Sequence, residues 1–127
     1  MKMDMPMTLG TMLLPKGTAA WVLGMMAHLM MGVIFFLIYA ALFAALGIES
    51  GIIGWSALFG AIHALLAGAA FGMMPTIHPR MATAPTASAG TVAAPGFFGL
   101  NMGMMGPVAI IAVHVVYGLV AGAIYAA

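Results

Sequence analysis

Three long stretches of this sequence contain no Asp, Glu, Lys or Arg, and each is long enough to cross a lipid bilayer as a helix. Roughly 20 apolar residues suffice, because about 30 Å of hydrocarbon is crossed at 1.5 Å per residue. The stretches are continuously apolar rather than alternating, which argues against barrel strands, and an open sheet edge would leave backbone groups unpaired in lipid. We therefore predict an all-α integral membrane helical bundle with three transmembrane helices at about residues 18–46, 52–74 and 105–126.

The charge content excludes several classes of function. Only 4% of the residues are charged and the net charge is +1, so no basic surface is available to bind nucleic acid. The chain contains no cysteine, which excludes disulfides and thiolate chemistry. We find no phosphate-binding loop, no pair of carboxylates with general-acid spacing and no serine beside a recognisable base. We therefore predict a chain that is not an enzyme and whose surroundings are the lipid bilayer.

The chain is short enough for one membrane domain, residues 1–127. A methionine-rich tail, residues 1–17, precedes the first span, and a long connection rich in Pro, Ala and Gly, residues 75–104, joins the second span to the third. Three spans place this connection on the same side as the N-terminus. All three cations lie on that side, so the positive-inside rule predicts a multi-pass protein of the cell (inner) membrane with a cytoplasmic N-terminus.

Small residues recur four or eight apart in each span, a pattern that lets membrane helices approach closely. More such positions are present than three helices need for packing on one another. The pattern predicts association with other membrane-protein subunits or with copies of this chain. The residues are Gly24 and Gly32 in the first span, Gly60, Ala64, Gly68 and Gly72 in the second, and Gly118 and Gly122 in the third.

Each span also contains one histidine, namely His28, His63 and His114. These residues lie nine to eleven positions from the tail-side ends of the predicted helices, which places all three about 13 to 17 Å deep, near the bilayer midplane. Ionisable side chains at that depth are costly and usually face a bundle interior or a cavity. The three histidines are therefore the candidate functional site.

Three roles remain open for these histidines. They could bind a cofactor: imidazole coordinates zinc or copper, serves as an axial ligand of haem, and can hold the magnesium of a (bacterio)chlorophyll. They could relay protons, since histidine titrates near neutrality. They could also act as hydrogen-bonding side chains between helices, with a backbone carbonyl, Ser56 or Tyr117 as partner, a contribution of about 1 kcal/mol each.

The fifteen methionines are confined to the tail, the first half of the first span and the surroundings of the long connection, and none occurs between Gly32 and Gly72 or after Met105. Thioether sulfur is a soft ligand that suits Cu(I), and the spacing of Met26 and Met30 places both on one helix face, from which they could pass an ion toward the histidines. The alternative is that methionine provides adaptable packing. The candidate metal ligands are thus the three histidines together with Met26, Met30 and the tail residues Met1, Met3, Met5 and Met7.

A methionine-rich tail, the pair Met26 and Met30, the pair Gly118 and Gly122, and three spans are together similar in outline to the CTR-type copper transporters. In that family the methionine pair belongs to the second span and the tail is extracellular, whereas here the pair is in the first span and the charges predict a cytoplasmic tail. The resemblance implies copper as the ligand of those two methionines.

These patterns predict a non-catalytic membrane subunit that packs into a larger complex or onto itself and carries an intramembrane histidine site. The alternative prediction is a copper-handling or copper-transporting membrane protein.

Overall fold

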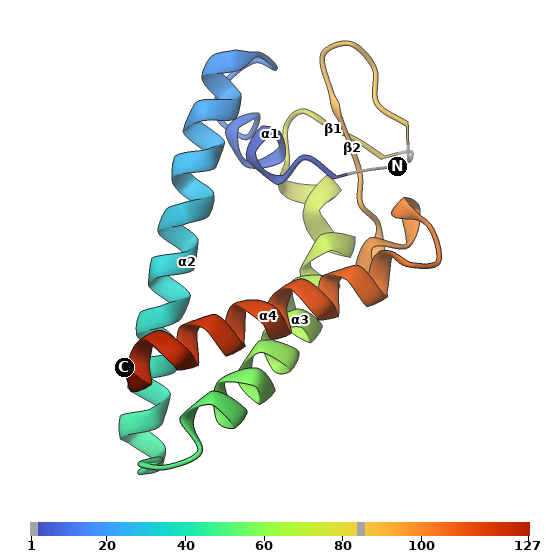
Figure 1. Ribbon diagram of the computed structural model, residues 1–127. Helices are drawn as coiled ribbons and strands as arrows, with labels where there is room; N and C mark the ends of the chain where they lie inside the picture. The colour runs from blue at the N-terminus through green and yellow to red at the C-terminus, as the bar shows by residue number, and fades with distance from the viewer. Residues whose placement is uncertain (1–2, 84–85) are drawn as a thin grey trace.

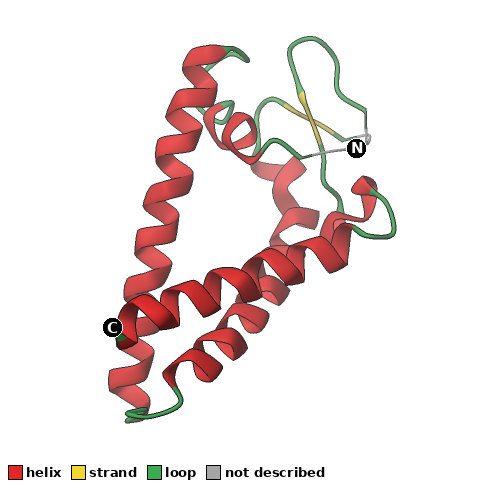
Figure 2. Cartoon of the chain, viewed as in Figure 1, coloured by secondary structure: helices red, strands yellow, loops and turns green. Residues whose placement is uncertain are grey.

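The computed structural model describes residues 3–83 and 86–127 and is almost entirely helical (Figure 2). Its three long helices are α2 (Thr18–Leu46), α3 (Ile52–Ile77) and α4 (Gly106–Ala126). All three are long and apolar enough to cross a membrane. The all-α, three-helix fold class predicted from the sequence is therefore confirmed, and the chain is a multi-pass membrane protein.

The helix ends agree closely with the predicted ones. Helix α2 has the predicted bounds, and α4 begins one residue later than predicted, with Pro107 in its first turn, where its missing N–H needs no partner. Helix α3 continues three residues beyond the predicted end and includes Pro75. A proline this close to a helix C-terminus removes one backbone hydrogen bond without preventing a last turn.

Two glycines end α2 and begin α3. Gly47 and Gly51 both have a φ of +64°, a left-handed conformation that glycine adopts without the steric penalty of a Cβ. Glu49 lies between them, in the turn that Figure 1 shows at the end of α2 away from α1. The turn therefore reverses the chain within a few residues.

Helices α3 and α4 form a tightly packed antiparallel pair (Figure 1). The contact depends on small residues, because a Cβ at Gly60 would collide with the backbone carbonyl of His114, and one at Gly118 would collide with the carbonyl of Ser56. The small residues at these positions therefore do form a packing face, but the face contacts another helix of the same chain.

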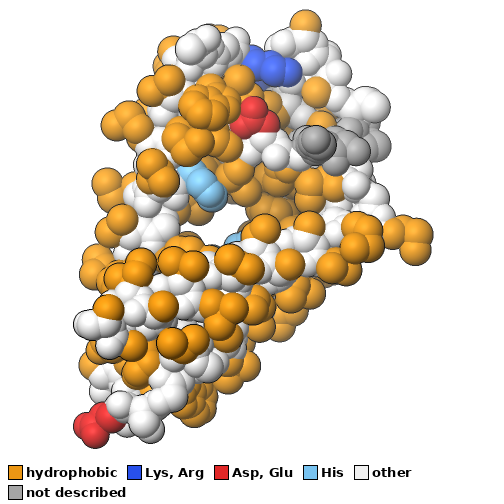
Figure 3. Space-filling view, viewed as in Figure 1, with side chains coloured by type: hydrophobic (Ala, Val, Ile, Leu, Met, Phe, Trp, Pro, Cys, Tyr) orange, Lys and Arg blue, Asp and Glu red, His pale blue; other side chains and the backbone are white. Residues whose placement is uncertain are grey.

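Helix α2 contacts this pair over its C-terminal half. Near the Glu49 turn a cluster of buried apolar side chains joins the three helices, formed by Tyr39, Phe43, Phe59 and Ala121. Further along α2, Phe35 stacks on His63 of α3, and the Gly32 carbonyl accepts a hydrogen bond from the Tyr117 hydroxyl of α4. Toward its N-terminal end α2 leans away from α3 and α4, and the space-filling view shows an opening between them (Figure 3). Helix α1 and the long connection lie across the far side of this opening (Figure 1).

The tail is an ordered segment that packs against α2. Helix α1 (Met5–Gly10) is capped at its N-terminus by Asp4, whose Oδ1 accepts a hydrogen bond of 2.9 Å from the amide of Met7. A Cβ at Gly24 would collide with the carbonyl of Pro6, so glycine at this position of α2 lets α1 approach. An isolated helix of six residues is unstable in water, and this packing therefore maintains it.

The long connection folds over the same end of the molecule. Two short strands, β1 (Met81–Ala82) and β2 (Val92–Ala93), pair in parallel, and the short 3-10 helix η1 (Phe97–Met102) follows. The rings of Phe97 and Phe98 pack over Gly72 and Gly68 of α3. These two glycines, too, make contacts within the chain.

Two residues of the connection hold α1 in place. The ring Nε2 of buried His78 donates to the carbonyl of Thr8 at 2.7 Å, and the Arg80 guanidinium donates to the carbonyl of Thr11 at 2.9 Å. The carbonyls at a helix C-terminus lack backbone partners in their own helix, so these bonds supply donors from outside it, and the Thr8 carbonyl also accepts from the Thr11 hydroxyl at 3.1 Å. His78 and Arg80 thus fasten the tail to the connection.

Replacing His78 with leucine should lower the free energy of unfolding by about 1 to 3 kcal/mol, because the buried Thr8 carbonyl would lose its shorter hydrogen bond and keep only the one of 3.1 Å from the Thr11 hydroxyl. Thermal or denaturant unfolding in detergent, followed by circular dichroism, would measure this change. The matched control is Lys16→Ala, which removes an exposed bond of 3.1 Å to the Thr91 carbonyl and should change stability by less than about 0.5 kcal/mol. If the two substitutions lowered the free energy of unfolding equally, the hydrogen bond from His78 would not be a main contact that holds α1 in place.

Candidate intramembrane histidine site

The structure brings two of the three membrane histidines together. The rings of His63 on α3 and His114 on α4 lie 4.6 Å apart between centroids, at an interplanar angle of 70°. The close α3–α4 contact at Gly60 produces this pairing, because Gly60 is one turn from His63 and packs on the backbone of His114. Both rings are half-buried.

Hydrogen bonds orient both imidazoles through the same ring atom. The Nδ1 of His114 lies 2.7 Å from the carbonyl oxygen of Ile110, and the Nδ1 of His63 lies 3.2 Å from the hydroxyl of Tyr39. A carbonyl oxygen only accepts, so Nδ1 of His114 carries the proton and its Nε2 has a free lone pair in the neutral ring. Among the described residues, neither Nε2 atom has a hydrogen-bond partner.

Aromatic side chains surround the pair. Phe35 of α2 stacks on His63 with centroids 3.8 Å apart, and Tyr117 of α4 lies beside the same ring at 6.2 Å. The Tyr117 hydroxyl donates to the backbone carbonyl of Gly32, which ties α4 to α2. Of the partners predicted from the sequence, a backbone carbonyl is found at His114, whereas among the described residues Tyr117 and Ser56 make no hydrogen bond to a histidine. Tyr39, which was not predicted from the sequence, is the partner of His63.

His28 is not part of this pair. It shares one face of α2 with Gly32, Phe35 and Tyr39, since positions i, i+4, i+7 and i+11 align along a helix. Phe35 is level with His63, so His28 lies about 10 Å further along the helix axis, beside the opening. Its side chain is exposed and has no hydrogen-bond partner among the described residues.

The predicted common level of the three histidines therefore differs from the observed arrangement. Depth was counted from each helix end on the assumption that the helices begin in one plane. Helix α2, with 29 residues, extends well beyond the 21 residues of α4 and leans away from it. Within residues 3–83 and 86–127, no group of three or more His, Cys, Asp or Glu side chains is placed to hold a metal ion.

The candidate methionine ligands lie elsewhere. Met26 and Met30 are more than half exposed and lie about 160° around α2 from His28, so they do not face the histidines. Met3, Met5 and Met7 are half-buried. Met3 and Met5 pack against a buried cluster of α3 and α4, and Met7 packs against the buried cluster of the connection that contains Met81. Met1 lies outside the described residues. The tail methionines thus contribute to the packing that joins the tail to α3, α4 and the connection.

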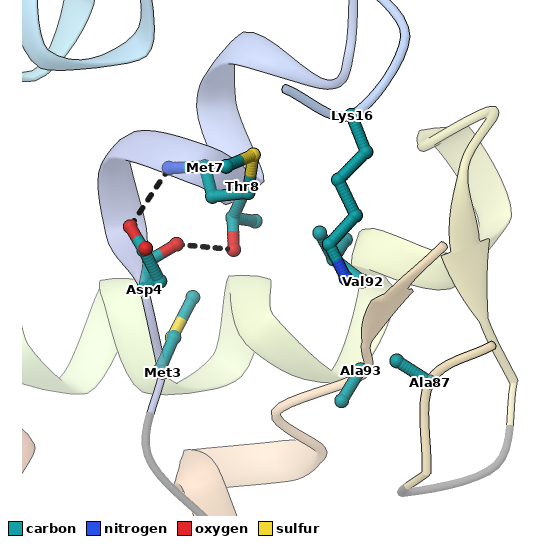
Figure 4. Close-up of a pocket in the computed structure, with 8 residues that line it drawn as sticks. All are labelled: Met3, Asp4, Met7, Thr8, Lys16, Ala87, Val92 and Ala93. Atoms are coloured by element: carbon teal, nitrogen blue, oxygen red, sulfur yellow. Dashed lines mark hydrogen bonds between the residues drawn. The ribbon is translucent and has the colours of Figure 1, made fainter. Parts of the chain in front are cut away.

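Two hollows accompany these features. An apolar groove of about 320 Å³ runs between α2 and α4 and is lined by Leu29, Gly32, Val33, Phe36, Tyr117, Val120, Ala121 and Ile124. A pocket of about 280 Å³ lies beside α1, where Met3, Asp4, Met7 and Thr8 face Lys16 and strand β2 (Figure 4). Only the groove borders the membrane-spanning part of α2.

The three membrane-spanning helices and the contact between His63 and His114 describe a small helical membrane protein with a pair of histidines between two of its spans. Comparison of the chain with protein-family models, with curated proteins and with solved structures finds no match. Its function is therefore argued from its own residues.

Proposed function

We propose that this chain is a non-catalytic membrane subunit, and that a transmembrane helix of another chain lies in the groove between α2 and α4. The other chain is a partner subunit or a second copy. The observation that carries the proposal is the apolar groove itself, which exposes Leu29, Gly32 and Val33 of α2. His28, an exposed imidazole without a hydrogen-bond partner among the described residues, lies one turn from Gly32 on the same helix, beside this groove rather than in it. Such a group in hydrocarbon is costly, and a neighbouring helix could accept its hydrogen bond.

The packing of α2 supports the same proposal. Beyond its contacts with α1 and the cluster near the Glu49 turn, α2 has few neighbours within the chain. Gly32 is open on the groove side, since the nearest atom to a Cβ built there is a Tyr117 ring carbon at 3.9 Å. A small residue beside an apolar groove is the kind of surface on which membrane helices associate.

We also propose an orientation for the chain in the membrane. Lys16 and Arg80 lie at the end of the molecule that carries α1 and the connection, whereas Glu49 lies at the opposite end. We propose that the protein lies in the inner membrane. By the positive-inside rule, the end that carries Lys16 and Arg80 would then face the cytoplasm.

Cysteine cross-linking tests the proposed interface cleanly, because the chain contains no cysteine of its own. We expect Val33→Cys, in the groove, to form a covalent adduct with a second copy or a partner when native membranes are oxidised or treated with a short bifunctional maleimide. Leu66→Cys on α3 is the matched control, being similarly exposed and apolar but outside the groove. Adducts at Leu66→Cys as abundant as those at Val33→Cys, or none at Val33→Cys, would refute the interface.

Copper handling is the second candidate function. The pairing of His63 with His114 favours it, whereas the positions of Met26 and Met30 do not connect the tail to that pair. The two candidate functions are compatible, since the pair is formed by α3 and α4 and does not require a partner helix.

A further inference from the structure

We infer that His63 and His114 bind one monovalent copper ion, Cu(I), through their Nε2 atoms. This inference rests on the second candidate function and gives it a site, a ligand set and an oxidation state. It uses two protein ligands rather than the three predicted from the sequence, and none of the methionines.

The first argument is the state of the four ring nitrogens. Histidines that bind metals usually hydrogen-bond through the ring nitrogen that does not bind the metal, often to a backbone carbonyl, which sets the tautomer and the orientation of the ring. Here both Nδ1 atoms are engaged, by the Ile110 carbonyl at 2.7 Å and the Tyr39 hydroxyl at 3.2 Å. A packing role for the two histidines would not require the same nitrogen to be free in both.

The second argument is the distance between the rings. With metal–nitrogen bonds of about 2.0 Å, each ring centre lies roughly 3 Å from the ion. Ligands on opposite sides of an ion would then have centres roughly 6 Å apart, whereas ligands at angles between 90° and tetrahedral would have centres roughly 4.5 to 5 Å apart. The observed 4.6 Å fits the bent arrangement and excludes one haem held between the two rings.

The third argument is charge. No Asp, Glu, Lys or Arg occurs within α2, α3 or α4, so no carboxylate within these spans could neutralise a divalent ion. The cost of placing an ion in a medium of low dielectric grows with the square of its charge, so a monovalent ion costs about one quarter as much as a divalent one. Among the metals that imidazole binds well, copper has a monovalent state.

The two rings would not complete the coordination of the ion. Two bent imidazole ligands leave one or two positions of Cu(I) unoccupied, and both rings are half-buried rather than enclosed. A small neutral ligand or a side chain of the proposed partner could complete the coordination there.

The test uses the full chain in detergent, loaded anaerobically with Cu(I) and freed of excess metal by gel filtration. X-ray absorption at the copper edge should reveal nitrogen ligands at about 2.0 Å, distinct from methionine sulfur at about 2.3 Å. In the double variant His63→Gln/His114→Gln, we expect the nitrogen shell to disappear and the copper content to fall by one ion per chain. His28→Gln is the matched control and should retain both.

A second variant separates metal binding from folding. Tyr39→Phe keeps the aromatic packing but removes the bond to Nδ1 of His63, and it should weaken Cu(I) binding about 10- to 100-fold while the chain remains folded. A nitrogen shell that persists in the double variant, a shell of sulfur alone in the unsubstituted chain, or displacement of the copper by an equal concentration of Zn(II) would each overturn the inference. None of these outcomes bears on the cross-linking at Val33.

Discussion

Replacing Gly60 with leucine is expected to separate α3 from α4 and to lower the free energy of unfolding by about 3 kcal/mol or more. The reason is steric. A Cβ at this position would collide with the backbone carbonyl of His114, and a backbone atom cannot move aside as the end of a side chain can. Unfolding in detergent, followed by circular dichroism or by resistance to SDS, would measure the loss.

Gly54 provides a matched control on the same helix. Nothing lies within 4 Å of a Cβ built there, so Gly54→Leu should leave the packing intact and should raise helix propensity slightly. The Gly60 variant should also separate the rings of His63 and His114, because the same contact produces their pairing. If the two leucine variants were equally stable, the close α3–α4 contact would be wrong.

Gly24→Leu is expected to detach the tail from the first span. Its side chain would occupy the position of the Pro6 carbonyl and the Gly10 amide, so α1 could not remain against α2. Without that contact a helix of six residues has little stability of its own, and we expect α1 to unfold. The bonds from His78 and Arg80 to α1 would be lost with it.

Trypsin provides a direct measurement, because the chain has only three Lys and Arg residues. Cleavage after Lys16 should become at least about tenfold faster in the Gly24 variant, as expected for a segment whose local stability falls by about 1.4 kcal/mol or more. Gly54→Leu again serves as the control and should be cleaved at the original rate. Unchanged cleavage of the Gly24 variant would mean that α1 is held by the connection alone.

The sequence predicted the spans well because their physical cause is local. Twenty or more residues without a charge can be sheltered only by lipid or protein, and in lipid the backbone must satisfy its own hydrogen bonds. The ends of α2 followed from Lys16 and Glu49 with their flanking glycines, so the prediction of residues 18–46 was correct to the residue.

The histidine site was predictable only in part. His63 and His114 were predicted to lie at similar depth because they are at similar distances from the tail-side ends of two antiparallel spans. In the structure their rings are in contact. Tyr39 was missed because its contact with His63 depends on where α2 meets α3, which no local pattern specifies. His78 was missed because its partner, the Thr8 carbonyl, is 70 residues away in the chain.

By itself, the sequence determined which segments are helical, where they end and which residue types lie in the membrane, since those properties depend on hydrophobicity and backbone geometry over a few turns. Only the tertiary structure determined that most of the small residues contact this same chain, that the tail is folded, and that α2 leans away with His28 at the opening. Those features depend on the angles between helices. The angles are set by side chains that meet across long sequence separations, as at Gly60 with His114 and Gly24 with Pro6.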